Sequence, residues 1–154
     1  MISSIAILVL STALFLFYVQ TLCENVLRRE FRRAYSRDVL NAIDLEFPRL
    51  RQAVDANVEV SLAQIRVALK ADYSTLTFLV KNGNPKQRHF SWKERMLKGY
   101  FRLLLVILPV RYAFHLQEKG AVIKLTTILH HFANLAGERV FTAEAPAIAQ
   151  SRQG

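Results

Sequence analysis

The side chains best suited to metal binding or redox chemistry are few and scattered. The chain has four histidines and one cysteine, Cys23. His130 and His131 are adjacent, so on a helix they point about 100° apart and cannot share a metal ion as an i,i+4 pair does. A single cysteine forms no internal disulfide, which fits a reducing compartment. We therefore predict no metal site and no bound cofactor.

Motifs typical of catalytic centres are also absent. Asp44 and Glu46 are close in sequence but face different sides of a helix, and acid–base catalysis needs carboxylates that converge. The sequence contains no G-x-S-x-G, no P-loop and no G-x-G-x-x-G motif. We predict no catalytic residues and identify no small-molecule substrate. An enzyme remains the last alternative, and a pocket with converging polar side chains would favour it.

One cluster of like charges has a suggestive position. It consists of five arginines that directly follow a long apolar segment: Arg28, Arg29, Arg32, Arg33 and Arg37. Each arginine near an anionic leaflet contributes about 1 kcal/mol, so these residues are candidate contacts for lipid or an acidic partner. The alternative is that they only set membrane topology, and we prefer it because arginines beside a span commonly do so.

A second basic segment, residues 86–95, interleaves cations with aromatic rings such as Phe90 and Trp92. Interleaving of this kind suits base stacking in a nucleic-acid site. It also occurs where an amphipathic helix begins near a membrane. No helix-turn-helix or zinc-finger spacing accompanies the segment, so we do not expect nucleic acid to be the partner.

The elements that would position these residues begin with an apolar segment, residues 2–22. Its 21 residues carry no charge and include twelve Leu, Ile, Val or Phe residues. A helix needs about 20 such residues to cross the hydrocarbon core. A cleaved signal peptide is the alternative, but no positive residue precedes the segment and no small-residue cleavage pattern ends it. We predict an uncleaved transmembrane anchor at 1–23.

Every charged residue lies beyond this anchor, since the first is Glu24. The net charge of +9 therefore belongs to the rest of the chain and suits an anionic partner. The positive-inside rule places this part in the cytoplasm and the N-terminus outside. Cys23 lies at the predicted boundary, where cysteines can be palmitoylated, but we prefer a small, buried, inert residue.

Two amphipathic helices are expected next. Residues 24–47 form a basic juxtamembrane helix with apolar residues every four positions, and Pro48 ends it. Residues 49–81 show the clearest helical pattern, because nine apolar side chains step by three or four. Residues 73–80 are also rich in types that favour strands, so the end of this helix is open.

Two further helices follow the breaker at 82–85. Ser91 and Glu94 form a capping box for a helix over 92–118, and Gly120 separates it from a helix over 121–141. The remaining tail, 142–154, contains a proline and scattered alanines, and we expect it to be disordered.

A second apolar segment, residues 103–110, tests the single-span interpretation. Extended to 98–116, it holds ten Leu, Ile, Val or Phe residues, which favour insertion by about 3 to 6 kcal/mol. Arg102 and Arg111 lie on opposite faces of such a helix and oppose insertion by about 5 to 7 kcal/mol. We therefore prefer a central core helix buried by the other three. A second or re-entrant span and an interfacial helix stay open.

The sequence thus predicts an all-α protein with one N-terminal transmembrane helix and a cytoplasmic bundle of about four helices. Its parts are the anchor at 1–23, the juxtamembrane helix at 24–47, a helical domain at 48–141 and the tail at 142–154. We expect a non-enzymatic protein that contacts membrane lipid and acts by binding another membrane protein or itself, as an accessory subunit or scaffold. The alternative is a membrane-tethered binding module for anionic lipid or nucleic acid.

Overall fold

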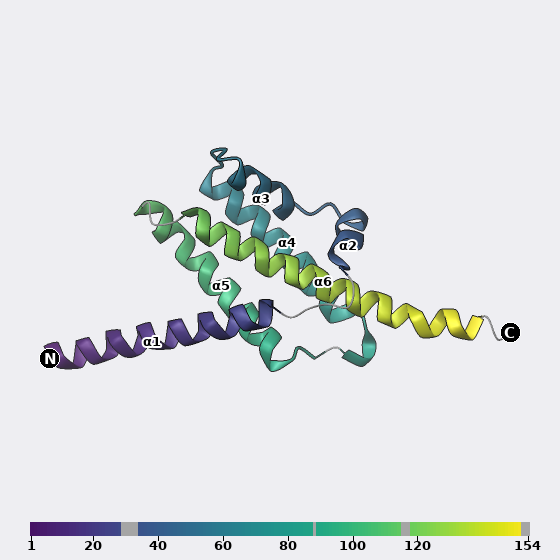
Figure 1. The fold of residues 1–154 in the computed structure, drawn as a ribbon, viewed down its shortest axis with the longest axis horizontal. Coiled ribbons are helices and arrows are strands. Elements are labelled where there is room, and N and C mark those ends of the chain that lie inside the picture. Colours follow the sequence, from purple (N-terminus) through teal and green to yellow (C-terminus); the bar gives the residue numbers. More distant parts are fainter. Residues whose placement is uncertain (29–33, 88, 115–117, 152–154) are drawn as a thin grey trace.

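The computed structural model describes residues 1–28, 34–87, 89–114 and 118–151, and in these residues the chain is helical with no strand (Figure 1). The all-α prediction is therefore confirmed for the described chain. The elements in order are α1 (Ile2–Leu27), α2 (Ser36–Ala42), α3 (Phe47–Asp55), α4 (Leu62–Asn82), the short 3-10 helix η1 (Pro85–Gln87), α5 (Trp92–Ala113) and α6 (Glu118–Ser151).

The helix α1 leaves the body of the molecule and extends alone to one side (Figure 1). All of residues 1–18 are exposed, although most are large and apolar. Among the described residues, α1 is the one helix whose length and hydropathy suit a bilayer span. The predicted N-terminal helix of that length and composition is confirmed.

The centre of the bundle is α6, which packs against α2, α3, α4 and α5. From Ala121 to Gly137 nearly every residue of α6 is buried or half-buried, on all sides of the helix. The expectation that the apolar segment of α5 would be the central helix is wrong. Only one face of α5 is buried, whereas Val106 and Val110 are 68% and 54% exposed.

The predicted helix over 49–81 is broken in two by residues 56–61. Asn57 adopts a positive φ of 56°, a conformation that asparagine tolerates better than most residues. Ser61 then caps α4, because its side chain accepts a hydrogen bond from the Gln64 amide at 3.3 Å. Residues 73–80 are helical, so the strand alternative for them is wrong.

Three other predicted boundaries differ. The expected helix over 24–47 is not continuous, since α1 ends at Leu27 and residues 43–46 are not helical between α2 and α3. The break after α5 falls at Phe114 rather than at Gly120, which lies within α6. The tail was expected to be disordered, but α6 continues to Ser151, and 152–154 lie outside the described residues. The capping box of Ser91 and Glu94 is confirmed.

Two short helices obtain their N-terminal caps from distant parts of the chain. Neither α2 nor α3 has a local side-chain cap. Instead, Oδ1 of Asn134 in α6 accepts a hydrogen bond from the Ser36 amide at 2.8 Å. Likewise, Oδ2 of Asp72 in α4 accepts one from the Phe47 amide at 2.6 Å. Unpaired amides at a helix start cost stability, so these buried caps position α2 and α3 on the bundle.

A buried arginine joins the middle of α6 to the start of α5 and the end of α4. Arg139 of α6 donates to both carboxylate oxygens of Glu94 in α5, at 3.1 and 2.9 Å. It also donates to the carbonyl oxygen of Val80, in the last turn of α4, at 2.8 Å. The side chains of Arg139 and Glu94 are only 6% and 9% exposed. Glu94 additionally accepts from the Ser91 amide, so one carboxylate serves both the capping box and the ion pair.

Breaking this ion pair should destabilise the domain strongly. Arg139→Met leaves the Glu94 carboxylate buried without its cation, and we expect a loss of about 3–5 kcal/mol in the free energy of unfolding. The matched control is Arg49→Met, because the Arg49–Asp44 pair at 3.2 Å is 74% and 82% exposed. The control should change stability by less than about 1 kcal/mol. Urea unfolding followed by circular dichroism in detergent measures both, and equal effects would contradict this role for Arg139.

The cap provided by Asp72 predicts a dependence on pH. Burial raises the pKa of Asp72 above its usual value, so the folded state holds this proton more tightly than the unfolded state. The stability that comes from binding this proton is therefore fully present below the pKa that Asp72 has in the unfolded chain. It is lost as pH rises through the higher pKa that Asp72 has in the folded chain.

Asp72→Asn keeps an acceptor for the Phe47 amide without the buried charge, whereas Asp72→Ala removes the acceptor. We expect Asp72→Ala to cost about 1–2 kcal/mol and Asp72→Asn to cost less. The stability of Asp72→Asn relative to wild type should increase with pH across the carboxyl titration. Urea titrations at several pH values test this, and a difference that falls with pH would refute it.

Candidate functional site

The end of α1 is built into the folded domain. Cys23 is 1% exposed and belongs to the hydrophobic core, with Val19 and Val26 packed against it. Glu24 also lies 3.8 Å from the ammonium group of Lys124 in α6. This burial agrees with our preference for Cys23 as an inert core residue. The first part of α1 is therefore apolar and exposed, whereas its last turns pack against the domain.

A cavity of about 430 Å³ opens where α1 meets the start of α5. Tyr18 and Leu22 of α1 line one side, Trp92 and Met96 of α5 line another, and His131 of α6 contributes as well. Trp92 is 74% exposed. Tyr and Trp are enriched where a membrane protein passes from lipid to water, because their rings are apolar and their polar atoms need partners. The cavity therefore lies at the level where α1 would leave a bilayer.

The structure describes two of the five candidate arginines. Arg28 is the C-cap of α1 and Arg37 lies in α2, and both are exposed. Arg29, Arg32 and Arg33 lie outside the described residues. The cluster is contiguous in sequence, but its described members belong to two different helices.

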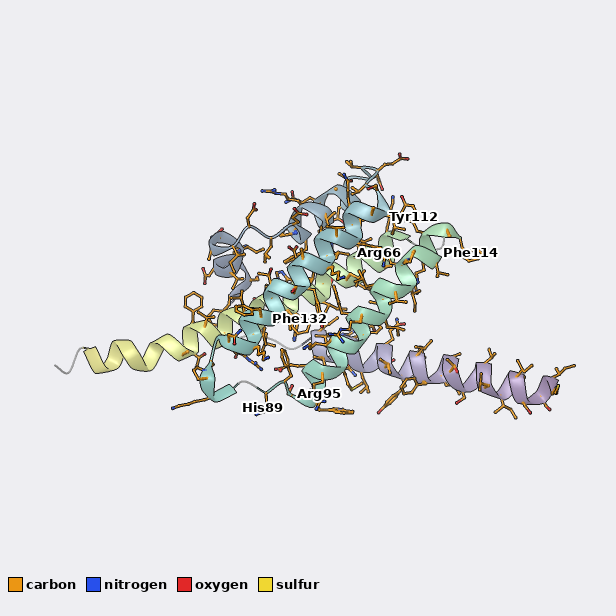
Figure 2. All side chains as sticks on the ribbon, turned by 180° about the vertical axis from the view of Figure 1, so that it is seen from behind. Arg66, His89, Arg95, Tyr112, Phe114 and Phe132 are labelled. Atoms are coloured by element: carbon orange, nitrogen blue, oxygen red, sulfur yellow. The ribbon has the colours of Figure 1, made fainter. Side chains whose placement is uncertain are left out.

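Arg95 of the predicted basic segment lies in a larger group of cations that the sequence did not predict, which we call the basic patch: Lys81, Arg95, Lys98 and Arg102. Burial lowers the pKa of Lys98, and the positive charges of Arg102, Lys81 and Arg95 lower it further. The Lys98 ammonium also lies 4.0 Å from the centre of the Phe90 ring. Figure 2 shows Arg95 at the start of α5, close to His89. The spacing of Arg95, Lys98 and Arg102 on one helix indicates this group, but Lys81 joins it only through packing.

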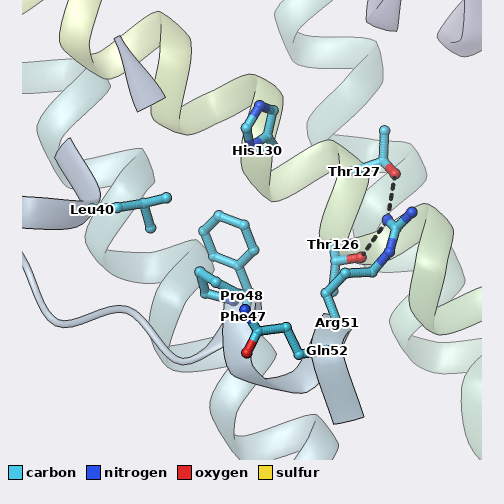
Figure 3. Close-up of a pocket in the computed structure, with 8 residues that line it drawn as sticks. All are labelled: Leu40, Phe47, Pro48, Arg51, Gln52, Thr126, Thr127 and His130. Carbon is cyan, nitrogen blue, oxygen red and sulfur yellow. Dashed lines mark hydrogen bonds between the residues drawn. The ribbon is translucent and has the colours of Figure 1, made fainter. Parts of the chain in front are cut away.

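Polar side chains converge at a pocket of about 430 Å³ between α2, α3 and α6 (Figure 3). The guanidinium of Arg51 donates to the hydroxyls of Thr126 and Thr127, both at 3.3 Å. Its other side lies 3.4 Å from Asp55. The lining residues are Leu40, Phe47, Pro48, Arg51, Gln52, Thr126, Thr127 and His130.

The polar groups of this pocket bind one another. Both threonine hydroxyls donate to the Ile123 carbonyl, at 2.9 and 2.8 Å. Nε2 of His130 lies 3.4 Å from Oγ of Ser36, beyond the reach of about 2.6–3.2 Å typical of a base and its nucleophile. Ser36 is also only 2% exposed, so a substrate could not reach it. We interpret the polar groups of this pocket as a structural contact between α3 and α6.

Metal chemistry has no visible site in the part of the chain that the structure describes. No group of three or more His, Cys, Asp or Glu residues converges there. The described surface features outside this pocket include the exposed part of α1, the cavity at its base and the basic patch.

Comparison with known proteins adds no functional information. No protein-family model, no curated protein and no solved structure matches this chain.

Proposed function

We propose that this protein is held in a membrane by α1 and acts by binding another membrane protein or a second copy of itself, as an accessory subunit or scaffold. The exposed apolar part of α1 carries the proposal, because residues 1–18 form a long hydrophobic surface that no other described part of the chain covers. In water such a surface would aggregate, whereas lipid covers it without cost.

The way α1 ends supports an uncleaved anchor over a signal peptide. Cleavage just before Cys23 would remove Val19, which packs against the core of the domain. Cleavage a few residues later would also remove Cys23, which is 1% exposed and belongs to that core. The orientation follows from charge. Arg28 at the end of α1 and Arg37 in α2 are exposed, and by the positive-inside rule these charges favour a cytoplasmic domain.

The cavity at the base of α1 is the surface we propose for the protein partner. Its lining combines the exposed ring of Trp92 with Met96, and tryptophan is among the residues that contribute most to protein interfaces. A partner within the same membrane would meet this cavity directly, since α1 itself forms one of its walls.

Binding of an anionic ligand is the second candidate, and the basic patch favours it. Repulsion among the four cations would be relieved by lipid phosphates. Lipid is a better candidate than nucleic acid, because three of the four cations lie on α5, whose start packs beside the anchor. Loss of the bound partner at moderately raised salt would favour this candidate over the first, since charge contacts are screened whereas apolar ones are not.

A matched pair of aromatic substitutions tests the interaction. Trp92→Ala removes the exposed ring at the cavity, whereas Phe78→Ala removes one from α4 that is 65% exposed. We expect native mass spectrometry of full-length protein from mild detergent to detect a complex larger than the 17.6 kDa chain. Trp92→Ala should weaken this complex at least tenfold, and Phe78→Ala should leave it unchanged.

Two results would contradict the proposal. One is a wild-type protein that stays monomeric and recovers no partner from membrane extracts. The other is a complex that both substitutions leave intact, which would move the interface away from the base of α1.

A further inference from the structure

The exposed face of α5 carries positive charges near its start and apolar side chains near its end. Its buried face packs on the core through residues such as Phe101, Leu104 and Leu108. The opposite, exposed face begins with Trp92, Arg95 and Arg102. It then becomes apolar, and the residues of this apolar stripe are Val106, Val110 and Phe114, which are 68%, 54% and 69% exposed. They are spaced by four, so they form one line on the helix surface.

The apolar end of α5 extends to the same side of the molecule as the free part of α1. Figure 1 shows both helices diverging from the base of α1 toward that side. Figure 2, from behind, places Phe114 at the far end of α5, again on the side to which α1 extends. Both exposed surfaces therefore become more apolar in the same direction, away from the base where Arg28 and the basic patch lie.

We propose that the apolar stripe of α5 inserts into the surface of the leaflet that α1 enters, as an interfacial helix. The basic patch then lies at the headgroups, and Val106, Val110 and Phe114 contact the outer acyl region. Arg111 is half-buried beside the stripe and has a side chain long enough to reach the headgroups. This inference rests on the membrane anchor proposed above.

Charge and geometry favour lipid over a second protein as the cover of this stripe. A bilayer surface presents anionic groups beside acyl chains, which matches a helix that is basic at one end and apolar at the other. The stripe also lies on the part of α5 that extends to the same side of the molecule as the exposed apolar part of α1 (Figure 1).

The single native tryptophan makes a direct test possible. We would replace Trp92 by Phe and introduce Val110→Trp in the full chain. The matched control is Val67→Trp, because Val67 is 71% exposed on α4. Each variant is reconstituted into vesicles of phosphatidylcholine and phosphatidylglycerol, with and without bromine on the acyl chains. Circular dichroism before and after reconstitution establishes that both variants fold.

We expect brominated lipid to quench tryptophan 110 at least twofold more than tryptophan 67, and aqueous iodide to do the reverse. Equal iodide quenching at both positions, with no effect of bromine at 110, would overturn the proposal. Protection of position 110 from both quenchers would also overturn it, because a protein surface would then cover the stripe. In each of these cases retention in carbonate-washed vesicles would still report on α1, so failure of the stripe and failure of the anchor are distinguishable.

Discussion

A single unbroken helix has to satisfy two environments, and this requirement governs the rest of the molecule. The first part of α1 is apolar and exposed, whereas Cys23 and Val26 near its end belong to or pack against the domain core. Because a helix is stiff over this length, α1 fixes the position of the domain relative to the surroundings of its exposed part. The cavity at the base of α1, the basic patch and the outer face of α5 are all placed by that junction.

The helices of the domain pack around α6, which between Ala121 and Gly137 is buried on nearly all sides yet carries polar residues. Asn134 caps α2, and Arg139 ties α6 to the start of α5 and the end of α4. Gly137 allows α2 to approach closely, since an added Cβ would collide with Tyr35. Leaving these buried polar groups unpaired would cost stability, so their pairing favours one arrangement of the helices.

Local patterns were sufficient to predict the apolar helix at the N-terminus, the breaker before α5 and the capping box of Ser91 and Glu94. They misplaced the centre of the bundle, because Asn134 looks like a solvent-facing residue when polarity alone is counted. The break at Asn57 was missed because the apolar spacing continues across it. The contact predicted for the arginine cluster stays a prediction, and the two described members, Arg28 and Arg37, are exposed. The joining of Lys81 to the cations of α5 depends on packing between helices and has no signature in sequence.

The claim that α1 is a retained membrane anchor can be tested most directly by the intact mass of the protein in carbonate-washed membranes. A retained anchor predicts that the chain stays in the membrane pellet at its full mass of 17.6 kDa, or at that mass less Met1, with residues 2–27 present. A shorter chain released into the supernatant, beginning within or after α1, would contradict it. The helix would then be a cleaved signal sequence, and the domain would have to fold without Val19 and its neighbours.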